Sequence, residues 1–188
     1  MYLKHKTMKM IEFKNLIGAK VNLIDLDLKY LDDMFEYSSD KRLYEHLEFE
    51  PHNNKKDTEK YLINLIKRSN EQNAHWWFIQ LKDTLKVIGS FGIHDINMSR
   101  SSCEISYALS PKYWGEKIFS DVMKSVLDYL IDDLSFHRIM VTTAKKNIRS
   151  IGAIKKFNFE QEGMLKDFYH DSNNNRFDAV IYSLVQKT

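Results

Sequence analysis

The most regular hydrophobic pattern in the chain lies between residues 110 and 134. Apolar residues recur at positions 118, 122, 126 and 130, and again at 119, 123, 127 and 131. A spacing of four places them on one broad face of a helix. Residues 102–109, directly upstream, form a predicted strand, and Gly115 lies between the two elements. The order is therefore a strand, a short loop and an amphipathic helix.

This strand–loop–helix junction is a candidate anion site. The first N–H groups of a helix have no partners within it, and the helix dipole makes that end partly positive. Phosphate groups bind well at such an end, and Lys112 and Lys117 add full positive charges beside it. An ordinary strand-to-helix connection is the alternative that these residues alone leave open.

Helical and strand patterns alternate along the rest of the chain. Residues 1–18 carry little pattern and suit a short strand with an extension. Helices are predicted from Asp27 to about Tyr37, over 40–47, from a cap at Asp57 or Thr58 to about Asn70, and from Asn147 to just before Asn158, which is expected to be left-handed. Further strands are predicted over 20–26, 75–81, 86–96, 137–144, 160–170 and 177–185, the last two forming a hairpin around 171–175. This order predicts an α/β (α+β) fold in which helices pack on a mixed sheet.

Composition narrows the class of protein. A chain of 188 residues with 43% hydrophobic and 29% charged residues is expected to form one domain over 1–188. The net charge of +2 gives no sign of a dedicated nucleic-acid binder. No apolar run approaches the roughly 20 residues of a membrane span, and the N-terminus lacks the apolar core of a signal peptide. The single cysteine, Cys103, is expected to be a buried, inert thiol in a reducing compartment, so we expect a cytoplasmic protein.

The junction also carries a resemblance. Lys112-Tyr113-Trp114-Gly115-Glu116-Lys117, after Pro111 and before the long helix, resembles the acetyl-CoA loop of the GNAT superfamily of N-acetyltransferases. The family pattern is Arg or Gln, two variable residues, Gly, one variable residue, then Gly or Ala. Here Lys112 replaces the first residue conservatively and Lys117 replaces the last small one. With ordinary helical angles the Lys117 N–H can still point at a phosphate; a requirement for glycine there would weaken binding.

The resemblance extends in order over about 160 residues. Residues 23–34 resemble the family's opening strand and first helix. Residues 103–107 resemble its Glu-Ile-Gly-Tyr strand, with Ser106 for glycine. Residues 147–150 resemble its Asn-x-x-Ser element, and 156–159 its Lys-Leu-Gly-Phe, with Asn158 for glycine. Glu162-Gly163 and 178–184 resemble its closing hairpin. The implied fold is a GNAT-like mixed, mostly antiparallel central sheet flanked by helices on both faces.

The resemblance implies roles for individual residues in acetyl transfer from acetyl-CoA to a primary amine. Glu104 is the candidate general base, and Ser150 is the candidate proton donor to the CoA sulfur. Asn147 is expected to hydrogen-bond the pantetheine arm, and Tyr107 to line the same slot. Ordinary structural roles are open for all four: a strand glutamate in a salt bridge, a first-turn serine, an N-cap and a core tyrosine. The residues expected to bind acetyl-CoA, the co-substrate, are Ser106, Tyr107, Leu109, Lys112, Tyr113, Trp114, Gly115, Glu116, Lys117, Ile118, Asn147 and Ser150.

Acceptor and mechanism are less specified. The closest branch acetylates ribosomal-protein N-termini, and a small amine such as a polyamine, aminoglycoside or amino sugar is the other option. Because no activated cysteine is evident, we expect direct transfer through a ternary complex. We also expect no metal, because the seven histidines show no metal-ligand spacing. His46, Glu48, Glu50 and His52 are a candidate cluster for recognising a cationic amine, with an ordinary solvated loop as the favoured alternative. His94 and Asp95 could face the acceptor, but a structural pair is the favoured interpretation. A homodimer and a non-catalytic acyl-CoA sensor on the same fold remain alternatives.

Overall fold

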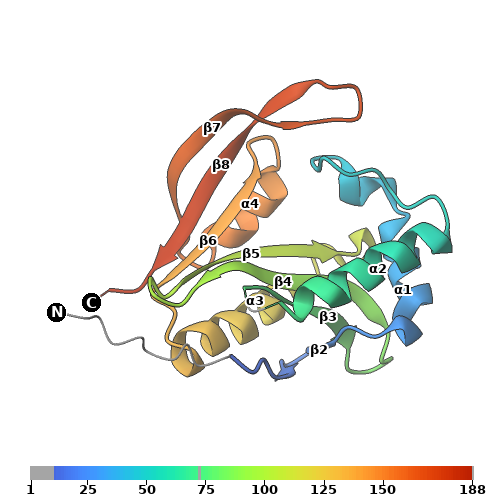
Figure 1. Cartoon of the computed structure of the whole chain (residues 1–188), viewed down its shortest axis with the longest axis horizontal. Helices are drawn as coiled ribbons and strands as arrows, with labels where there is room; N and C mark the ends of the chain where they lie inside the picture. Colours follow the sequence, from blue (N-terminus) through green and yellow to red (C-terminus); the bar gives the residue numbers. More distant parts are fainter. Residues whose placement is uncertain (1–10, 72, 188) are drawn as a thin grey trace.

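A computed structural model of the chain describes residues 11–71 and 73–187. Within these residues the chain forms an eight-stranded sheet in the order β1-β2-β3-β4-β5-β6-β8-β7, with helices on both faces (Figure 1). The strands are β1 (Leu16–Ile17), β2 (Val21–Asp25), β3 (His75–Leu81), β4 (Val87–Asn97), β5 (Ser102–Leu109), β6 (Arg138–Ala144), β7 (Glu160–His170) and β8 (Arg176–Val185). The helices are α1 (Leu31–Ser38), α2 (Lys55–Ser69), α3 (Ile118–Asp128) and α4 (Ile148–Lys155). Shorter turns of helix are η1 (Leu28–Tyr30), η2 (Lys41–Tyr44), η3 (Pro111–Tyr113) and η4 (Tyr129–Asp133).

The sheet is antiparallel except where β5 meets β6. These two strands pair in parallel over three positions only, from Ser102 opposite Arg138 to Glu104 opposite Met140. Beyond Glu104, β5 continues to Leu109 with its ladder to β4 alone, and β6 continues with its ladder to β8. The two strands therefore diverge in the middle of the sheet.

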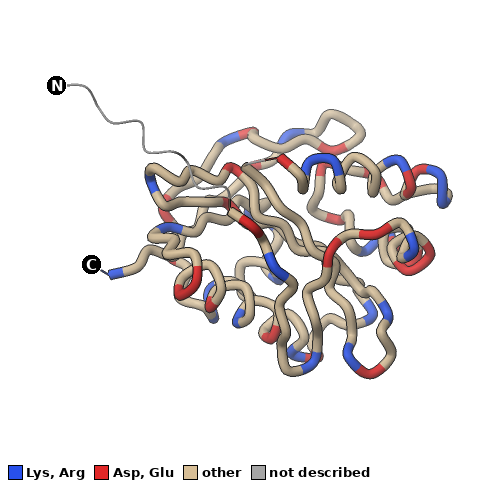
Figure 2. Tube along the Cα trace, turned by 60° about the horizontal axis from the view of Figure 1, so that its bottom comes forward, with Lys and Arg blue, Asp and Glu red and all other residues tan. Residues whose placement is uncertain are grey.

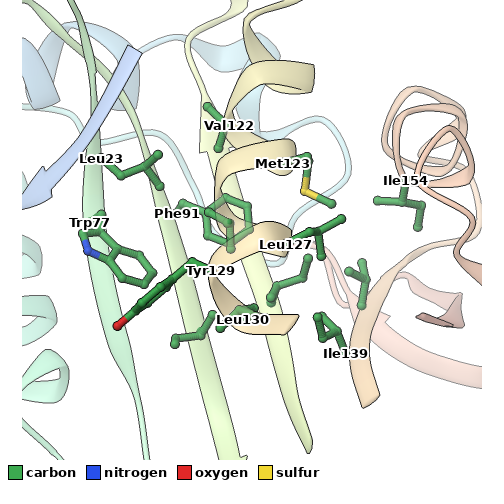
Figure 3. Packing of buried hydrophobic residues seen from close by; sticks show 14 of the residues in the cluster. Leu23, Trp77, Phe91, Val122, Met123, Leu127, Tyr129, Leu130, Ile139 and Ile154 are labelled. Carbon is green, nitrogen blue, oxygen red and sulfur yellow. The ribbon is translucent and has the colours of Figure 1, made fainter. Parts of the chain in front are cut away.

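Helices α3 and α4 cover one face of the sheet. The apolar face of α3 packs Val122, Met123 and Leu127 against Leu23, Trp77 and other side chains from the strands (Figure 3). From α4, Ile154 joins the same cluster and is fully buried. The regular spacing predicted over 118–131 therefore serves to bury one continuous core, and this core fixes the N-terminal end of α3 beside β5.

Helices α1 and α2 cover the other face, with Met34 and Leu62 packed on Phe78. On this face Trp76 lies directly over Gly92 of the neighbouring strand. A Cβ at Gly92 would lie 2.0 Å from the indole nitrogen of Trp76. Gly92 is therefore required by the close approach of an aromatic ring rather than by its backbone angles.

Replacing Gly92 with alanine is expected to destabilise the protein. The buried Trp76 ring would have to move, and overpacking of this kind costs about 1–3 kcal/mol. The melting temperature should fall by roughly 5 °C, measured by circular dichroism. Gly163→Ala is the matched control, because nothing lies within 4 Å of a Cβ at Gly163. Equal melting temperatures for the two variants would contradict the packing argument.

The predicted mixed, mostly antiparallel sheet with helices on both faces is confirmed, and several boundaries differ. The amphipathic helix predicted after Gly115 is α3, which begins at Ile118 because the backbone at Lys117 is left-handed; η3 precedes it and η4 continues it. The cap of α2 is Asn54, whose side chain accepts from the N–H of Asp57, and not Asp57 or Thr58. Asn158 is left-handed at φ 61°, as predicted. No helix among the described residues is long and apolar enough to cross a membrane.

Basic and acidic positions are interspersed along the trace rather than separated onto two faces (Figure 2). Several of them form ion pairs: Lys124 with Asp128 on α3, and Lys145, just after β6, with Asp178 of β8. Exposed pairs of this type contribute little to stability. The mixed distribution agrees with the near-neutral net charge and leaves local clusters as the places where charge has a specific role.

Candidate active site

The site is built around the point where β5 and β6 diverge. Pairing ends at Glu104 and Met140, and the next β6 amide that faces β5 belongs to Thr142. The Glu104 carboxylate accepts a hydrogen bond from this N–H at 3.0 Å. The Glu104 side chain thus accepts a hydrogen bond from β6 at a position where the backbone of β5 no longer pairs with β6. The glutamate predicted as the general base already uses one oxygen in holding the two strands together.

The loop between β5 and α3 has two consecutive features that shape it for a ligand. Gly115 has φ 87° and Lys117 has φ 62°, so the chain turns twice through the left-handed region before α3 begins. Lys117 therefore does not have the ordinary helical angles under which its N–H could point at a phosphate. The family's preference for a small residue at this position has a physical reason, since the left-handed conformation is costly for residues with a Cβ.

A cavity of about 450 Å³ lies against this loop. It is bounded by the end of β5, the loop, the first turn of α3, the start of α4 and the η2 segment. Its lining residues are Arg42, Leu43, His46, Leu47, Tyr107, Leu109, Tyr113, Trp114, Gly115, Lys117, Phe119, Ser120, Asn147, Ile148, Arg149, Ser150, Gly152, Ala153 and Lys156. Eight of the twelve residues predicted to bind the cofactor lie there: Tyr107, Leu109, Tyr113, Trp114, Gly115, Lys117, Asn147 and Ser150.

The charge of the cavity lining is one-sided. Arg42, Lys117, Arg149 and Lys156 line it, and none of the described lining residues is Asp or Glu. Arg42 is partly neutralised by Asp40, 2.6 Å away. The Arg149 guanidinium lies 3.6 Å from the centre of the Trp114 ring, so it joins α4 to the loop across the cavity. Such a lining suits a ligand with several phosphate groups.

Lys112, one of the residues predicted to contact phosphate, is paired with an acidic side chain in this structure. Its ammonium group binds Glu36 of α1 at 2.7 Å, and Lys86 binds the same carboxylate. These hydrogen bonds, with Lys112 the stronger partner, hold the pKa of Glu36 below its usual range. Lys112 therefore points to the α1 side of the loop and does not line the cavity. Cations that the sequence analysis did not select, Arg149 and Lys156 on α4 and Arg42 on η2, lie there instead.

Three other predicted contacts also lie away from the cavity. Ile118 is buried in the core below α3. The carbonyl of Glu116 accepts a hydrogen bond from the Lys20 ammonium at 3.1 Å. Ser106 pairs with Gly92 in the sheet, and it alternates with Tyr107, which belongs to the α3-side cluster. Ser106 therefore faces the α1–α2 side, because successive strand residues point to opposite faces.

Tyr107 and Ser150 form the polar pair of the cavity. Their hydroxyl oxygens are hydrogen-bonded at 2.7 Å. The Asn147 side chain caps α4 by accepting from the N–H of Ser150 at 3.1 Å, which fixes the serine on the first turn. Burial raises the pKa of Tyr107 to about 12, so the phenol keeps its proton in the neutral range. The pair can therefore donate a proton but is not a ready base.

The four residues predicted as one amine-recognition cluster do not act together. His46 lines the cavity. The His52 ring is hydrogen-bonded to Thr58 at 2.9 Å. Glu48 accepts from the backbone N–H of His170 at 3.2 Å, which joins the loop after η2 to the β7–β8 hairpin.

Comparison with known proteins gives the family. The sequence model described as "Acetyltransferase (GNAT) domain" matches residues 20–160. The chain belongs to the GNAT family. An uncharacterised N-acetyltransferase of Bacillus licheniformis, p20, is 25% identical over 93% of this chain and 97% of its own. The "Putative ribosomal N-acetyltransferase YdaF" of Bacillus subtilis is 23% identical over 54% of this chain and 55% of its own.

Solved structures show the same fold. The microcin C7 self-immunity acetyltransferase MccE, determined in complex with acetyl-CoA and AMP, superimposes with a TM-score of 0.80. It is 19% identical, over 90% of this chain and 94% of that one. This GNAT protein is an acetyl-CoA-dependent acetyltransferase, and the basic cavity with its left-handed glycine loop fits the phosphates of that co-substrate.

Proposed function

We propose that this GNAT enzyme transfers the acetyl group directly to a primary amine within a ternary complex. The observation that carries the proposal is the Tyr107–Ser150 pair in a cavity whose charged lining is cationic. Lys117, Arg149 and Lys156 would hold the phosphates of acetyl-CoA. Asn147 caps the helix that presents Ser150, so the hydroxyl pair is oriented before the substrates bind.

The residues supply the proton transfers that the reaction needs. The amine attacks as the free base, so one proton must leave its ammonium form, and Glu104 is the carboxylate at the strand divergence that can take it. As the C–N bond forms and the C–S bond breaks, the thiolate sulfur takes a proton from the Tyr107–Ser150 pair. The attacking nitrogen then loses its second proton, which reprotonates the Tyr107–Ser150 pair. A backbone N–H of β5 beyond its pairing with β6 would be the donor for the thioester oxygen.

A covalent route through a cysteine is disfavoured by the burial of Cys103. Its side chain is fully buried in the sheet core, and burial raises the pKa of the thiol to about 12. A thiol in this state is neither accessible nor a nucleophile at neutral pH. A single reduced thiol also fits action in the cytoplasm.

Cys103→Ala is expected to keep its turnover within about two-fold, because the thiol takes no part in the reaction. Turnover is measured as free CoA thiol released per second, with circular dichroism to confirm the fold. A large loss of kcat with an intact fold would point to an acyl-enzyme instead.

The acceptor is proposed to be a protein N-terminus or a small amine. The YdaF relative supports the ribosomal option, and the resemblance of the acetyl-CoA loop supports it independently. Four candidate acceptors distinguish these options: spermidine, kanamycin, glucosamine and a peptide whose N-terminal residue is alanine. Product is quantified by mass spectrometry. Binding of acetyl-CoA without acetylation of any of them would favour a sensor role for the domain.

A further inference from the structure

His94 and Asp95 form a polar cluster on the Trp76 side of the sheet, outside the lining of the cofactor cavity. The His94 Nδ1 and an Asp95 carboxylate oxygen are 2.8 Å apart. A carboxylate can only accept, so Nδ1 donates and Nε2 carries the lone pair of the neutral ring. A ring nitrogen of His94, an oxygen of Asp95 and an oxygen of Glu104 all lie within 4.8 Å of one another.

Strand register brings these groups together from distant parts of the sequence. His94 of β4 lies opposite Glu104 of β5 in the antiparallel ladder. The register then shifts between His94 and Asn97, and Asp95 takes a left-handed backbone with φ 49°. A bulge re-aims a side chain that the pleat would otherwise send to the opposite face. Here it lets Asp95 reach the ring of the residue directly before it.

The surroundings hold the ring in place. The imidazole stacks nearly parallel to the Trp76 ring, with 6.3 Å between centroids and 11° between planes. The Arg68 guanidinium lies 4.7 Å from the same Trp76 ring. The side chain of His94 is 23% exposed and that of Asp95 is 73% exposed. The cluster thus runs from Glu104, at the strand divergence, to bulk solvent.

We propose that His94, positioned by Asp95, carries the proton of the acceptor amine from Glu104 to solvent. The proposal rests on amine acetylation as the function. The ammonium N–H bond breaks and its proton binds Glu104. A ring nitrogen of His94 lies within 4.8 Å of a Glu104 oxygen. The proton then passes to the lone pair on His94 Nε2, directly or through one water molecule. The Asp95 carboxylate stabilises the imidazolium, which releases the proton to water.

The chemistry balances without a further reactant. The amine keeps its electron pair and uses it to form the C–N bond, and nothing is oxidised or reduced. Glu104 returns to the carboxylate that holds Thr142, and His94 returns to its neutral ring. The relay also reconciles the structural hydrogen bond of Glu104 with a proton-accepting role, because the carboxylate has a second oxygen and is discharged after each turnover.

The test is chemical rescue. His94→Gln keeps a side chain that can hydrogen-bond Asp95 but cannot carry a proton. With acetyl-CoA and the fastest of the four candidate acceptors, kcat should fall about 10- to 100-fold, with the KM for acetyl-CoA unchanged. Added imidazole should restore kcat in proportion to its concentration. Asp95→Asn should lose less activity than His94→Gln. His137→Gln changes an exposed histidine directly before β6, outside the His94, Asp95 and Glu104 group, and should have parental kcat and no response to imidazole.

Other outcomes overturn the relay. Full activity of His94→Gln excludes it, and a loss that imidazole does not restore assigns His94 a structural role. The three side chains could also ligate a divalent cation; loss of parental activity in a chelator would replace the relay with a metal site. If the parent protein binds acetyl-CoA by calorimetry but acetylates no amine, the result contradicts both the proposed function and the relay. If the parent enzyme acetylates an amine and His94→Gln is equally active, only the relay is excluded and the proposed function stands.

Discussion

Replacing Gly115 with valine is expected to abolish CoA binding and leave the fold in place. Gly115 has φ 87°, and a β-branched residue there must either stay strained or relax to negative φ. Relaxation turns the loop N–H groups away from the phosphates they are proposed to bind. A Cβ at this position meets no atom within 4 Å, so the ligand-free protein has room for the side chain. Affinity should fall at least about 100-fold, on the order of 3 kcal/mol.

Isothermal titration with CoA measures this loss, and two variants serve as controls. Gly163→Val introduces the same side chain on β7, away from the cavity and without positive φ, and should bind like the parent. Lys112→Ala should also bind nearly like the parent, because Lys112 pairs with Glu36 outside the cavity. Parental CoA affinity in Gly115→Val would mean that the diphosphate does not bind this loop.

Removing the Tyr107–Ser150 pair is expected to slow the chemical step. Tyr107→Phe and Ser150→Ala each delete one hydroxyl of the pair, and loss of a general acid costs about 100-fold in kcat. The two groups act as one unit, so the double variant should be little slower than either single variant. Acetyl-CoA affinity should change much less than kcat.

A steady-state comparison of kcat with calorimetric affinity checks this result. Tyr182→Phe is the control, since the Tyr182 hydroxyl donates to Gln161 elsewhere in the core. Burial holds the pKa of Tyr107 at about 12, so ionisation of this phenol should not reduce activity anywhere between pH 6 and pH 9. Strictly additive losses in the double variant would show that the hydroxyls act separately.

Local patterns in the sequence predicted most of the elements. The strands at 75–81 and 102–109 match the structure at both ends, because dense aromatic or β-branched positions end at turn residues. The cap at Asn147 was also readable, since Asn precedes an apolar run at helical spacing. The break at Lys117 was not, because a lysine in the left-handed region has no local signature in the sequence.

The parts of the site that depend on distant segments could not be predicted. Lys112 was assigned to phosphate, and its actual partner, Glu36, is 76 residues away. Arg42 and His46 reach the cavity from a segment that precedes the β5 loop by more than sixty residues. The pairing of His94 with Glu104 depends on strand register across β4 and β5. These contacts arise only when the sheet is assembled, so they cannot be predicted from a single sequence without its relatives.

The short pairing of β5 with β6 also bears on how the native protein opens. Among the described residues, three registered positions join the strands β1–β5 to the strands β6–β8, and only the edge pair β1–β2, with two, is shorter. The active site therefore lies at the shortest ladder in the interior of the sheet. Proteins open in cooperative units whose borders follow such weak connections. In the ligand-free enzyme, amide hydrogens near Thr142 should exchange with deuterium well before those in the β3–β4 ladder. A co-substrate bound between β5 and β6 would hold the two parts of the sheet together. We therefore expect the amide hydrogens of β6 to exchange more slowly when it is bound.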